Sequence, residues 1–273
     1  MKKSLIATAA LAALVGAPAA AADLPVKAAF SSPPAYNWTG FYLGASGGYS
    51  FNRLNVNDVD FWNGFGDNSQ HNNGFAIGGT VGYNWQVRSL VYGVEGDISY
   101  LSNNSTFNGN IALQPCAGCR VGFPFAAISS KIDTLATLRG RIGIAVDPAL
   151  LYLTGGAAFG HVKNSYADIA FLGGPGTNGN LACPGCTAWT DSGWRAGWVF
   201  GAGVESALGG NWTAKVEALY YQLSDKTVSV APYVTNGNAN LAGAPFRQRF
   251  DDSGLIARVG VNYRFGGPIV ANY

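Results

Sequence analysis

Charge is scarce in this chain of 273 residues. Asp, Glu, Lys and Arg make up 12% of it, about half the share of an ordinary soluble domain. The formal net charge of +2 is due to Lys2 and Lys3, because the 17 basic residues exceed the 15 acidic ones by those two alone. The rest of the chain is balanced and lacks the basic field of a nucleic-acid-binding protein. Nucleic acid is therefore not a predicted partner.

Long hydrophobic runs are also missing, apart from one near the amino terminus. Leu5 to Val15 is apolar, follows the two lysines and precedes the small residues Ala20 to Ala22. This pattern predicts a signal peptide over residues 1–22. A retained membrane helix is the alternative, but the run is short and no charged stop follows it. No other stretch approaches the roughly 20 apolar residues of a membrane helix, so a membrane-spanning chain must use strands.

Groups suited to catalysis are few. The chain has two histidines, His71 and His161, and neither accompanies a nucleophile and an orienting carboxylate. Glu95 and Asp97 are paired carboxylates of the kind used in acid–base chemistry, but they lack such companions. The sequence therefore predicts a protein that is not an enzyme, with no cofactor and no metal; a membrane-embedded hydrolase or acyltransferase is a remote alternative.

Apolar and polar residues alternate over many segments of the chain. Between residues 253 and 266, Leu255, Val259 and Phe265 point to one face of a strand, whereas Arg258 and Arg264 point to the other. The same alternation predicts eight strands over residues 40–51, 75–87, 90–102, 131–146, 151–163, 194–208, 212–224 and 253–266. Each reaches about the 9–11 residues that a tilted strand needs to cross a bilayer.

The predicted fold class is all-β: an eight-stranded antiparallel up-and-down transmembrane β-barrel of the outer-membrane type, apolar outside and polar inside. A soluble lipocalin-like barrel is the competing fold, and it would turn its apolar face inward. Three short connections, at residues 88–89, 147–150 and 209–211, alternate with four long ones. Short periplasmic turns opposite long outer loops are typical of outer-membrane barrels.

The domain plan follows from these connections. After the signal peptide, residues 23–39 form a proline-containing periplasmic leader, residues 40–266 the barrel and residues 267–273 a short tail. The four outer loops are predicted over residues 52–74, 103–130, 164–193 and 225–252. Opposed residues of a hairpin share a face, which pairs Val87 with Leu90, Val146 with Leu151, and Leu208 with Trp212.

Aromatic residues on the outward face fall at two heights. One predicted girdle, near the short turns, contains Phe41, Trp85, Tyr92, Trp212, Tyr263 and Phe265. The second, near the long loops, contains Tyr49, Phe51, Phe75, Tyr100, Phe159, Trp194, Trp198 and Tyr220. Aromatic rings favour the headgroup layers of a membrane, whereas core aromatics of a soluble protein would not gather at both ends of every hairpin.

Charged residues fall on the inward face and predict a polar network in the lumen. Its members are Glu95, Asp97, Asp133, Arg139, Arg141, Arg195, Glu205, Lys215, Glu217, Arg258 and Arg264. Glu205 is placed opposite Lys215, and Glu95 and Asp97 are level with Arg139 and Arg141. Because the interior of eight strands is just wide enough for its own side chains, one interpretation is a plug of ion pairs. The other is a conducting, charge-selective constriction.

The four cysteines form two Cys-x-x-Cys pairs, Cys116 with Cys119 and Cys183 with Cys186. Both pairs lie in predicted outer loops of an exported chain, where disulfides persist. Two local disulfides are the first interpretation. A link between the two loops, a shared zinc ion and a redox-active pair are the alternatives.

Both ends of the barrel region carry motifs of a known family. The chain opens with Asp23-Leu-Pro, enters the barrel through YNWTGFYLG at residues 36–44 and leaves it through VNYRFGGP at residues 261–268. It resembles the small outer-membrane immunogenic proteins of alphaproteobacteria, an opacity-protein-like group often described as a porin family. The resemblance covers essentially the whole mature chain.

The resemblance implies an eight-stranded outer-membrane barrel that acts as a surface antigen, supports envelope integrity and sometimes forms a small pore. Haem binding has been attributed to some members, and no catalytic residues come with the family. The implied partners are outer-membrane lipid, the barrel-insertion machinery and host or environmental ligands at the outer loops. The cysteine pairs depart from the family pattern. The extension beyond Phe265 to Tyr273 also departs from it, so either Phe265 or Tyr273 could be the aromatic that the insertion machinery recognises.

Overall fold

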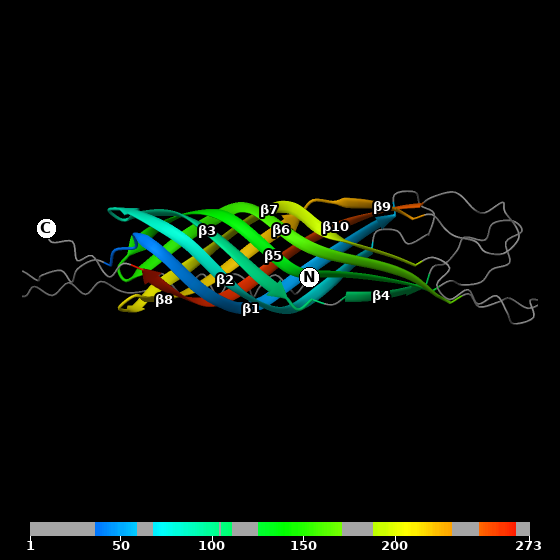
Figure 1. The fold of residues 1–273 in the computed structure, drawn as a ribbon, viewed down its shortest axis with the longest axis horizontal. Coiled ribbons are helices and arrows are strands. Elements are labelled where there is room, and N and C mark those ends of the chain that lie inside the picture. Colours follow the sequence, from blue (N-terminus) through cyan, green and yellow to red (C-terminus); the bar gives the residue numbers. More distant parts are fainter. Residues whose placement is uncertain are drawn as a thin grey trace, which may run out of the picture. The chain divides into compact units, whose positions relative to one another are not determined.

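The computed structural model describes residues 36–58, 68–103, 105–110, 125–170, 188–230 and 246–265. Its eight long strands are β1 (Gly40–Asp58), β2 (Asn68–Val87), β3 (Leu90–Leu101), β5 (Phe125–Val146), β6 (Ala149–Ala170), β7 (Ala188–Gly209), β8 (Trp212–Leu223) and β10 (Phe246–Phe265). All neighbours are antiparallel, and β1 pairs with β10 to close the ring (Figure 1). The predicted eight-stranded antiparallel barrel is confirmed.

Two short strands lie beside the ring. β4 (Ser105–Asn110) pairs with β5, and β9 (Lys226–Val230) pairs with β10. Both lie toward the end of the barrel opposite the short turns (Figure 1). The described residues contain no helix of the length and hydropathy needed to cross a membrane.

The strands continue well into the segments predicted as long loops, and this is a correction. The β1–β2 ladder runs out to Val56 opposite Asn68, and the β5–β6 ladder to Phe125 opposite Ala170. These extensions are rich in Asn, Ser and Ala, so they lack the alternation of apolar and polar residues that marks a strand at a membrane. Backbone ladder bonds form without that contrast, which is why the sequence pattern underestimated the strands.

The three short turns each contain two residues: Arg88–Ser89, Asp147–Pro148 and Gly210–Asn211. The predicted pairing of Val87 with Leu90 is confirmed. The predicted pairing of Val146 with Leu151 is wrong, because the strands continue closer to the turn and Val146 pairs with Ala149 instead. A shift of two residues preserves the face, so Leu151 still points outward and is 52% exposed.

The third predicted pair, Leu208 with Trp212, is also wrong. The β7–β8 ladder shifts register between Ala207 and Gly209, so that Gly209 takes the place opposite Trp212. Gly209 and Gly210 adopt φ angles of +118° and +57°, in the region that glycine enters at little cost. The glycines allow the tight turn, and Leu208 is left as the extra residue of a bulge.

The two faces of the barrel wall have opposite chemistry. Val259 and Ile142 are 60% and 54% exposed on the outside, whereas Arg139 and Glu95 are 1% and 2% exposed on the inside. A soluble barrel has the reverse polarity, with apolar side chains inside. An apolar outer band with a polar interior is the arrangement of a barrel whose outer wall meets lipid.

Candidate functional site

Eight of the eleven charged residues predicted to face the lumen meet near its centre. We call these four acids and four bases the central ion cluster: Glu95, Asp97, Glu205, Glu217, Arg139, Arg141, Lys215 and Arg258. All eight are buried, and they come from β3, β5, β7, β8 and β10. With each side chain in its ionised form, the cluster is electrically neutral.

Arg139 contacts three acids of the cluster, and Arg258 forms ion pairs with the same three. Its Nη2 contacts Glu95 and lies 2.8 Å from an oxygen of Asp97, and its Nη1 lies 3.0 Å from Glu217. The Arg139 guanidinium therefore joins three carboxylates that belong to β3 and β8. Because a guanidinium presents five donors in a fixed plane, this residue type suits a junction of several acids.

Arg258 and Lys215 link the same carboxylates from the opposite wall. The two Nη atoms of Arg258 lie 3.2 Å from Asp97 and 2.6 Å from Glu217. Lys215 Nζ lies 3.2 Å from Glu95. Each acid that touches Arg139 thus has a second basic partner, and the contacts cross the lumen from wall to wall.

Within the cluster, Arg141 links Glu95 to Glu205, which lies at the end nearer the short turns. Its Nη2 donates to Glu205 over 2.9 Å, and its guanidinium lies 4.0 Å from the ring centroid of Tyr152. Glu205 also accepts hydrogen bonds from Thr213 and Asn262 over 2.5 and 2.7 Å. Neutral side chains therefore complete the hydrogen bonding of this acid.

Two tyrosines fill the remaining space, and glycines make room for them. Tyr42 donates to Glu95 over 2.7 Å, and Tyr152 donates to Glu217 over 3.1 Å. A side-chain carbon at Gly82 would lie 2.3 Å from the Tyr42 hydroxyl oxygen, and one at Gly203 would lie 2.5 Å from that of Tyr152. These inward glycines are required because the tyrosine rings occupy the volume of any larger residue.

One predicted pair, Glu205 and Lys215, are ladder partners but do not form an ion pair with each other. Glu205 and Lys215 are opposite each other on β7 and β8, as the hairpin spacing indicates. Their charged groups turn to other partners, Glu205 to Arg141 and Lys215 to Glu95. Hairpin spacing therefore gives the register of neighbours but not the partner across the lumen.

The other three residues of the predicted lumen network lie elsewhere. Arg195 is nearer the outer end and contacts Asp252 over 2.7 Å, an acid that was not among the predicted residues of the lumen. Arg264 is at the short-turn end, where it donates to the backbone oxygen of Thr39 and lies over the Tyr36 ring. Asp133 contacts His161 and Lys163.

The prediction that Asp133 faces the lumen is wrong, and Ile132, which the same alternation would place on the outer face, points inward. The β5–β6 ladder shifts register between Ile132 and Thr134, which leaves Asp133 as an extra residue. The bulge turns Ile132 inward, where it is 4% exposed, and turns Asp133 toward Lys163, whose side chain is 52% exposed. A single inserted residue reverses the face of everything beyond it, and strict alternation does not reveal it.

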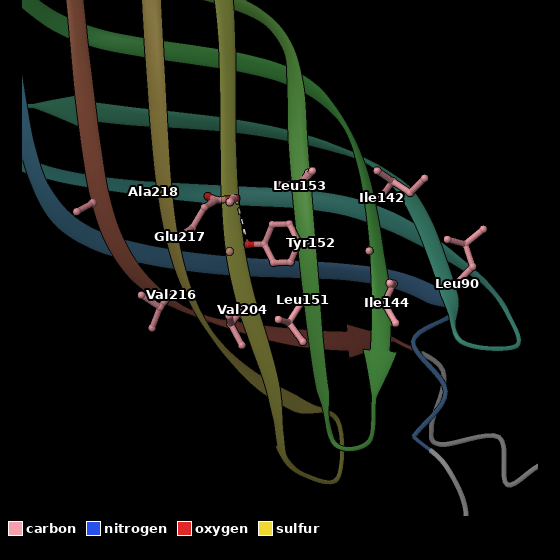
Figure 2. Close-up of a pocket in the computed structure, with 14 residues that line it drawn as sticks. Leu90, Ile142, Ile144, Leu151, Tyr152, Leu153, Val204, Val216, Glu217 and Ala218 are labelled. Atoms are coloured by element: carbon pink, nitrogen blue, oxygen red, sulfur yellow. Dashed lines mark hydrogen bonds between the residues drawn. The ribbon is translucent and has the colours of Figure 1, made fainter. Parts of the chain in front are cut away.

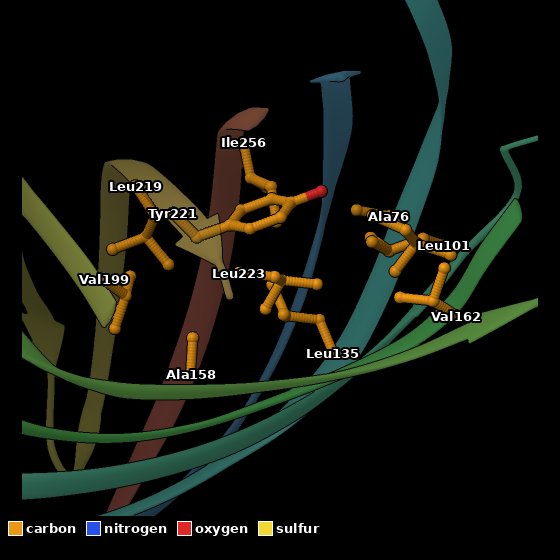
Figure 3. Packing of buried hydrophobic residues seen from close by; sticks show 11 residues of the cluster. Ala76, Leu101, Leu135, Ala158, Val162, Val199, Leu219, Tyr221, Leu223 and Ile256 are labelled. Atoms are coloured by element: carbon orange, nitrogen blue, oxygen red, sulfur yellow. The ribbon is translucent and has the colours of Figure 1, made fainter. Parts of the chain in front are cut away.

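An apolar layer fills the lumen between the central ion cluster and the outer end. We call it the outer apolar layer: Ala76, Leu101, Ile132, Leu135, Ala158, Val162, Val199, Leu219, Tyr221, Leu223 and Ile256. Figure 3 shows these side chains gathered inside the ring of strands. This layer was not predicted. The available signal in the sequence was that Leu219, Tyr221 and Leu223 share the inward face with Lys215 and Glu217.

The segment before β1 packs into the opposite end of the barrel. Trp38 is fully buried and packs with Val91, Leu150 and Tyr152. Its backbone nitrogen donates to Gln86 over 2.6 Å, and that of Tyr36 donates to Asp147 over 3.0 Å. Residues 36–39 were predicted to belong to an extended leader, and the structure instead packs them into the mouth of the barrel.

The residues of the predicted girdles lie on the outer wall in two groups. Near the short turns, Phe41 contacts Phe265 with ring centroids 5.5 Å apart, and Trp85 stacks on Tyr92 at 5.7 Å. Near the other end, Tyr49 contacts Phe75 at 5.5 Å, and Trp198 contacts Tyr220 at 5.6 Å.

Between these groups the wall has an apolar hollow of about 770 Å³, lined by outward residues such as Leu151, Leu153 and Val216 (Figure 2). Ala202, Ala218 and Ala257 are neighbours across β7, β8 and β10 and leave room there for lipid chains.

The extended part of the barrel carries ion pairs at its surface. Asp225 contacts Arg249, and this hydrogen bond raises the pKa of the Arg249 guanidinium above its ordinary value. Asp191 contacts Lys226. Among the described residues no group of His, Cys, Asp and Glu is placed to hold a metal ion. Cys116, Cys119, Cys183 and Cys186, the signal peptide and Tyr273 lie outside the described residues.

Comparison with known proteins gives one family. A family model for the outer membrane protein beta-barrel domain matches residues 7–265. The 31 kDa outer-membrane immunogenic protein of Brucella melitensis biotype 1 is 31% identical over 282 residues, which cover 97% of this chain and 100% of that protein. The 25 kDa outer-membrane immunogenic protein of Brucella canis is 29% identical, with 96% and 98% covered.

A third relative is the 22 kDa outer membrane protein of Rhizobium leguminosarum bv. viciae, which is 28% identical over 89% of this chain and 83% of its own length. Among solved structures, OprG from Pseudomonas aeruginosa is similar with a TM-score of 0.45 and 12% identity, covering 86% of this chain and 100% of that one. Similarity at the level of OprG supports no functional conclusion.

Proposed function

The chain belongs to the outer-membrane β-barrel domain family, and we propose that it is a structural and surface-interacting protein of the envelope whose lumen is closed to solutes. It resides in the outer membrane of a Gram-negative bacterium. The observation that carries the proposal is the central ion cluster, in which four acids and four bases contact one another across the lumen and are almost inaccessible to water.

Three successive layers favour a closed lumen over a pore. Trp38 fills the mouth at the short-turn end, the central ion cluster occupies the middle and the outer apolar layer follows. An ion crossing the barrel would have to separate several buried ion pairs and then pass an apolar layer. Each ion would lose its hydration there, at a free-energy cost on the order of several kcal/mol.

Single-channel recording in planar bilayers tests the closed lumen. The purified full chain is expected to give no reproducible conductance steps, and Arg249→Ala, which changes a surface ion pair, serves as the matched control. Steady conductance that changes with Arg139→Ala or Glu95→Ala would instead identify the small passive porin that is the rival function. In that case the central ion cluster is a charge-selective constriction.

The surface role is proposed for the outer end of the barrel. Two of the relatives carry the name immunogenic, and the strands of this chain continue beyond the outer aromatic group toward that end. Host or environmental ligands that contact the loops are the partners this role requires. The mature chain is exported after removal of residues 1–22, and the insertion machinery recognises a carboxyl-terminal aromatic such as Phe265.

Proteolysis of intact cells tests the orientation. The first cuts are expected within residues 164–193, in the connection after the end of β6 at Ala170 and before the start of β7 at Ala188, because exposed Gly-rich connections are preferred sites of cleavage. The turn at Arg88 is the internal control, since it should become accessible only after the outer membrane is permeabilised. Cleavage at Arg88 in intact cells, with residues 164–193 protected, would show the reverse orientation.

A further inference from the structure

The bulge in β5 turns one acid onto the outer wall beside two basic residues. Ile132 pairs with Val162 and Thr134 with His161, so Asp133 has no partner of its own in the ladder. Its two carboxylate oxygens each contact a side chain of β6: one lies 2.8 Å from His161 Nδ1 and the other 2.8 Å from Lys163 Nζ. The bulge therefore fixes the position of both side chains on the outside of the barrel.

A second lysine lies directly opposite the first. Lys131 on β5 and Lys163 on β6 are ladder partners. Like charges directly opposite each other destabilise a sheet, and Asp133 engages Lys163 and His161 only. Within the described residues, Lys131 makes no ion pair. The nearest acid on β7, Asp191, is engaged by Lys226. Among the residues that the structure describes, the group thus has an excess of positive charge with no anion to balance it.

The height of this group on the wall coincides with the outer aromatic residues. Phe159 is two residues before His161 on the same face of β6 and is 42% exposed. Trp194 is the ladder partner of His161, their rings are 5.5 Å apart, and Trp194 is 60% exposed. Exposed Trp and Phe rings mark the boundary between acyl chains and headgroups, so the lysines project at headgroup level.

We propose that Lys131, His161 and Lys163 form a docking site for the phosphate of a phosphorylated glycolipid in the outer leaflet. Asp133 is a positioning residue, because it orients Lys163 and His161 and leaves Lys131 available. The phosphate supplies the missing anion between two opposed lysines, and Trp194 packs against the lipid beside it. The proposal uses the membrane location and the orientation of the barrel, but it is independent of whether the lumen is closed.

Lipid binding by the purified full chain tests the site, measured by native mass spectrometry in a nonionic detergent. The probes are lipid A with its phosphates, the same lipid after dephosphorylation, and inorganic phosphate. The wild-type protein is expected to retain the phosphorylated lipid over the other two. The double variant Lys131→Gln/Lys163→Gln should bind it about 30-fold more weakly, the combined effect of two lysines near an anionic surface.

Arg53→Gln is the matched control, because Arg53 is an exposed cation on β1, away from β5 and β6 in the ring. It should leave retention of the lipid unchanged. Heat-modifiable mobility verifies that each variant is folded, and Lys131→Gln alone, which removes no ion pair of the described residues, provides a milder test. An approximately fivefold loss is expected for that single change.

Three results would overturn the proposal. Equal retention of the phosphorylated and dephosphorylated lipids would show that phosphate is not recognised. An equal loss of lipid retention in Arg53→Gln would show that general surface charge, rather than this site, accounts for the binding. Binding of inorganic phosphate at the same affinity as the lipid would assign the site to a free anion. None of these results bears on conductance, so they are distinguishable from failure of the closed-lumen function.

Discussion

The barrel of this protein is filled in two different ways at two heights. In the central ion cluster, eight charged side chains hold the walls together through contacts such as Arg139 to Glu217 at 3.0 Å. In the outer apolar layer, side chains such as Leu219 and Ile256 pack as they do in a soluble core. The first layer depends on an exact balance of charge, whereas the second depends on volume, so the two should respond differently to the loss of a single side chain.

The largest expected effect is in the central ion cluster. Arg139→Ala removes the cation that contacts Glu95, Asp97 and Glu217 and leaves a buried excess of negative charge. Breaking one partner of a buried ion pair costs about 3–5 kcal/mol. Urea unfolding of the reconstituted barrel, followed by tryptophan fluorescence, measures the loss. Adding Glu95→Gln should restore neutrality and part of the stability; no recovery in the double variant would show that charge balance is not the cause.

Moving a charge to the other face of the same strand sharpens the contrast. Val259 is next to Arg258 but faces outward and is 60% exposed. Val259→Arg should impair insertion, because an arginine at the lipid-facing midplane costs about 2–4 kcal/mol. Assembly is measured by heat-modifiable mobility, and Ile142→Arg on β5 is expected to behave alike. Val259→Leu is the apolar control. Wild-type assembly of both arginine variants would contradict a lipid-facing wall.

A deletion in the outer apolar layer comes next. Leu219→Ala leaves a cavity among buried apolar side chains and should lower the free energy of unfolding by about 2–3 kcal/mol, within the range for buried leucines. The same urea experiment applies. Leu219→Met, which nearly conserves volume, should lose less. If Leu219→Ala destabilised the barrel more than Arg139→Ala, volume rather than charge would dominate both layers.

The smallest effect is expected for an ion pair at the surface. Arg249→Ala removes a contact with Asp225, but both side chains are open to water, where ion pairs contribute little. The unfolding midpoint should not change measurably, at low or at high salt. A loss comparable to that of Arg139→Ala would mean that the number of ion pairs, rather than their burial, sets the stability of the barrel.

Residue patterns predicted the barrel because a wall with lipid on one side imposes strict alternation. The outward positions of Val259, Ile142 and Trp85 and the inward positions of Arg139 and Glu95 follow from that rule alone. The rule of alternation fails where no lipid lies beside the strand and where a bulge adds a residue. It missed the polar extensions of the strands, because strand segments that do not contact lipid need no apolar face. It also assigned Ile132 and Asp133 to the wrong faces, because a bulge adds one residue to β5 and breaks the period of two.

Candidate site residues were predictable in kind but not in partnership. Alternation selected the eight residues of the central ion cluster, and hairpin spacing placed Glu205 opposite Lys215. It gave no hint that Lys215 contacts Glu95 or that Arg195 contacts Asp252. Those pairs come from strands far apart in the sequence, and their relative height is set by the tilt and stagger of the closed ring.

The sequence by itself determined, apart from the part of β5 beyond the bulge at Asp133, which face of each strand meets lipid. It also determined how many strands form the ring and which charged residues lie at its centre. These follow from a period of two residues and from the cost of exposing charge to hydrocarbon. Only the tertiary structure decided which charges meet, that an apolar layer lies above them, and that Trp38 returns into the mouth. Closure of the ring brings side chains from distant strands to one height, and no local sequence pattern predicts which of them meet.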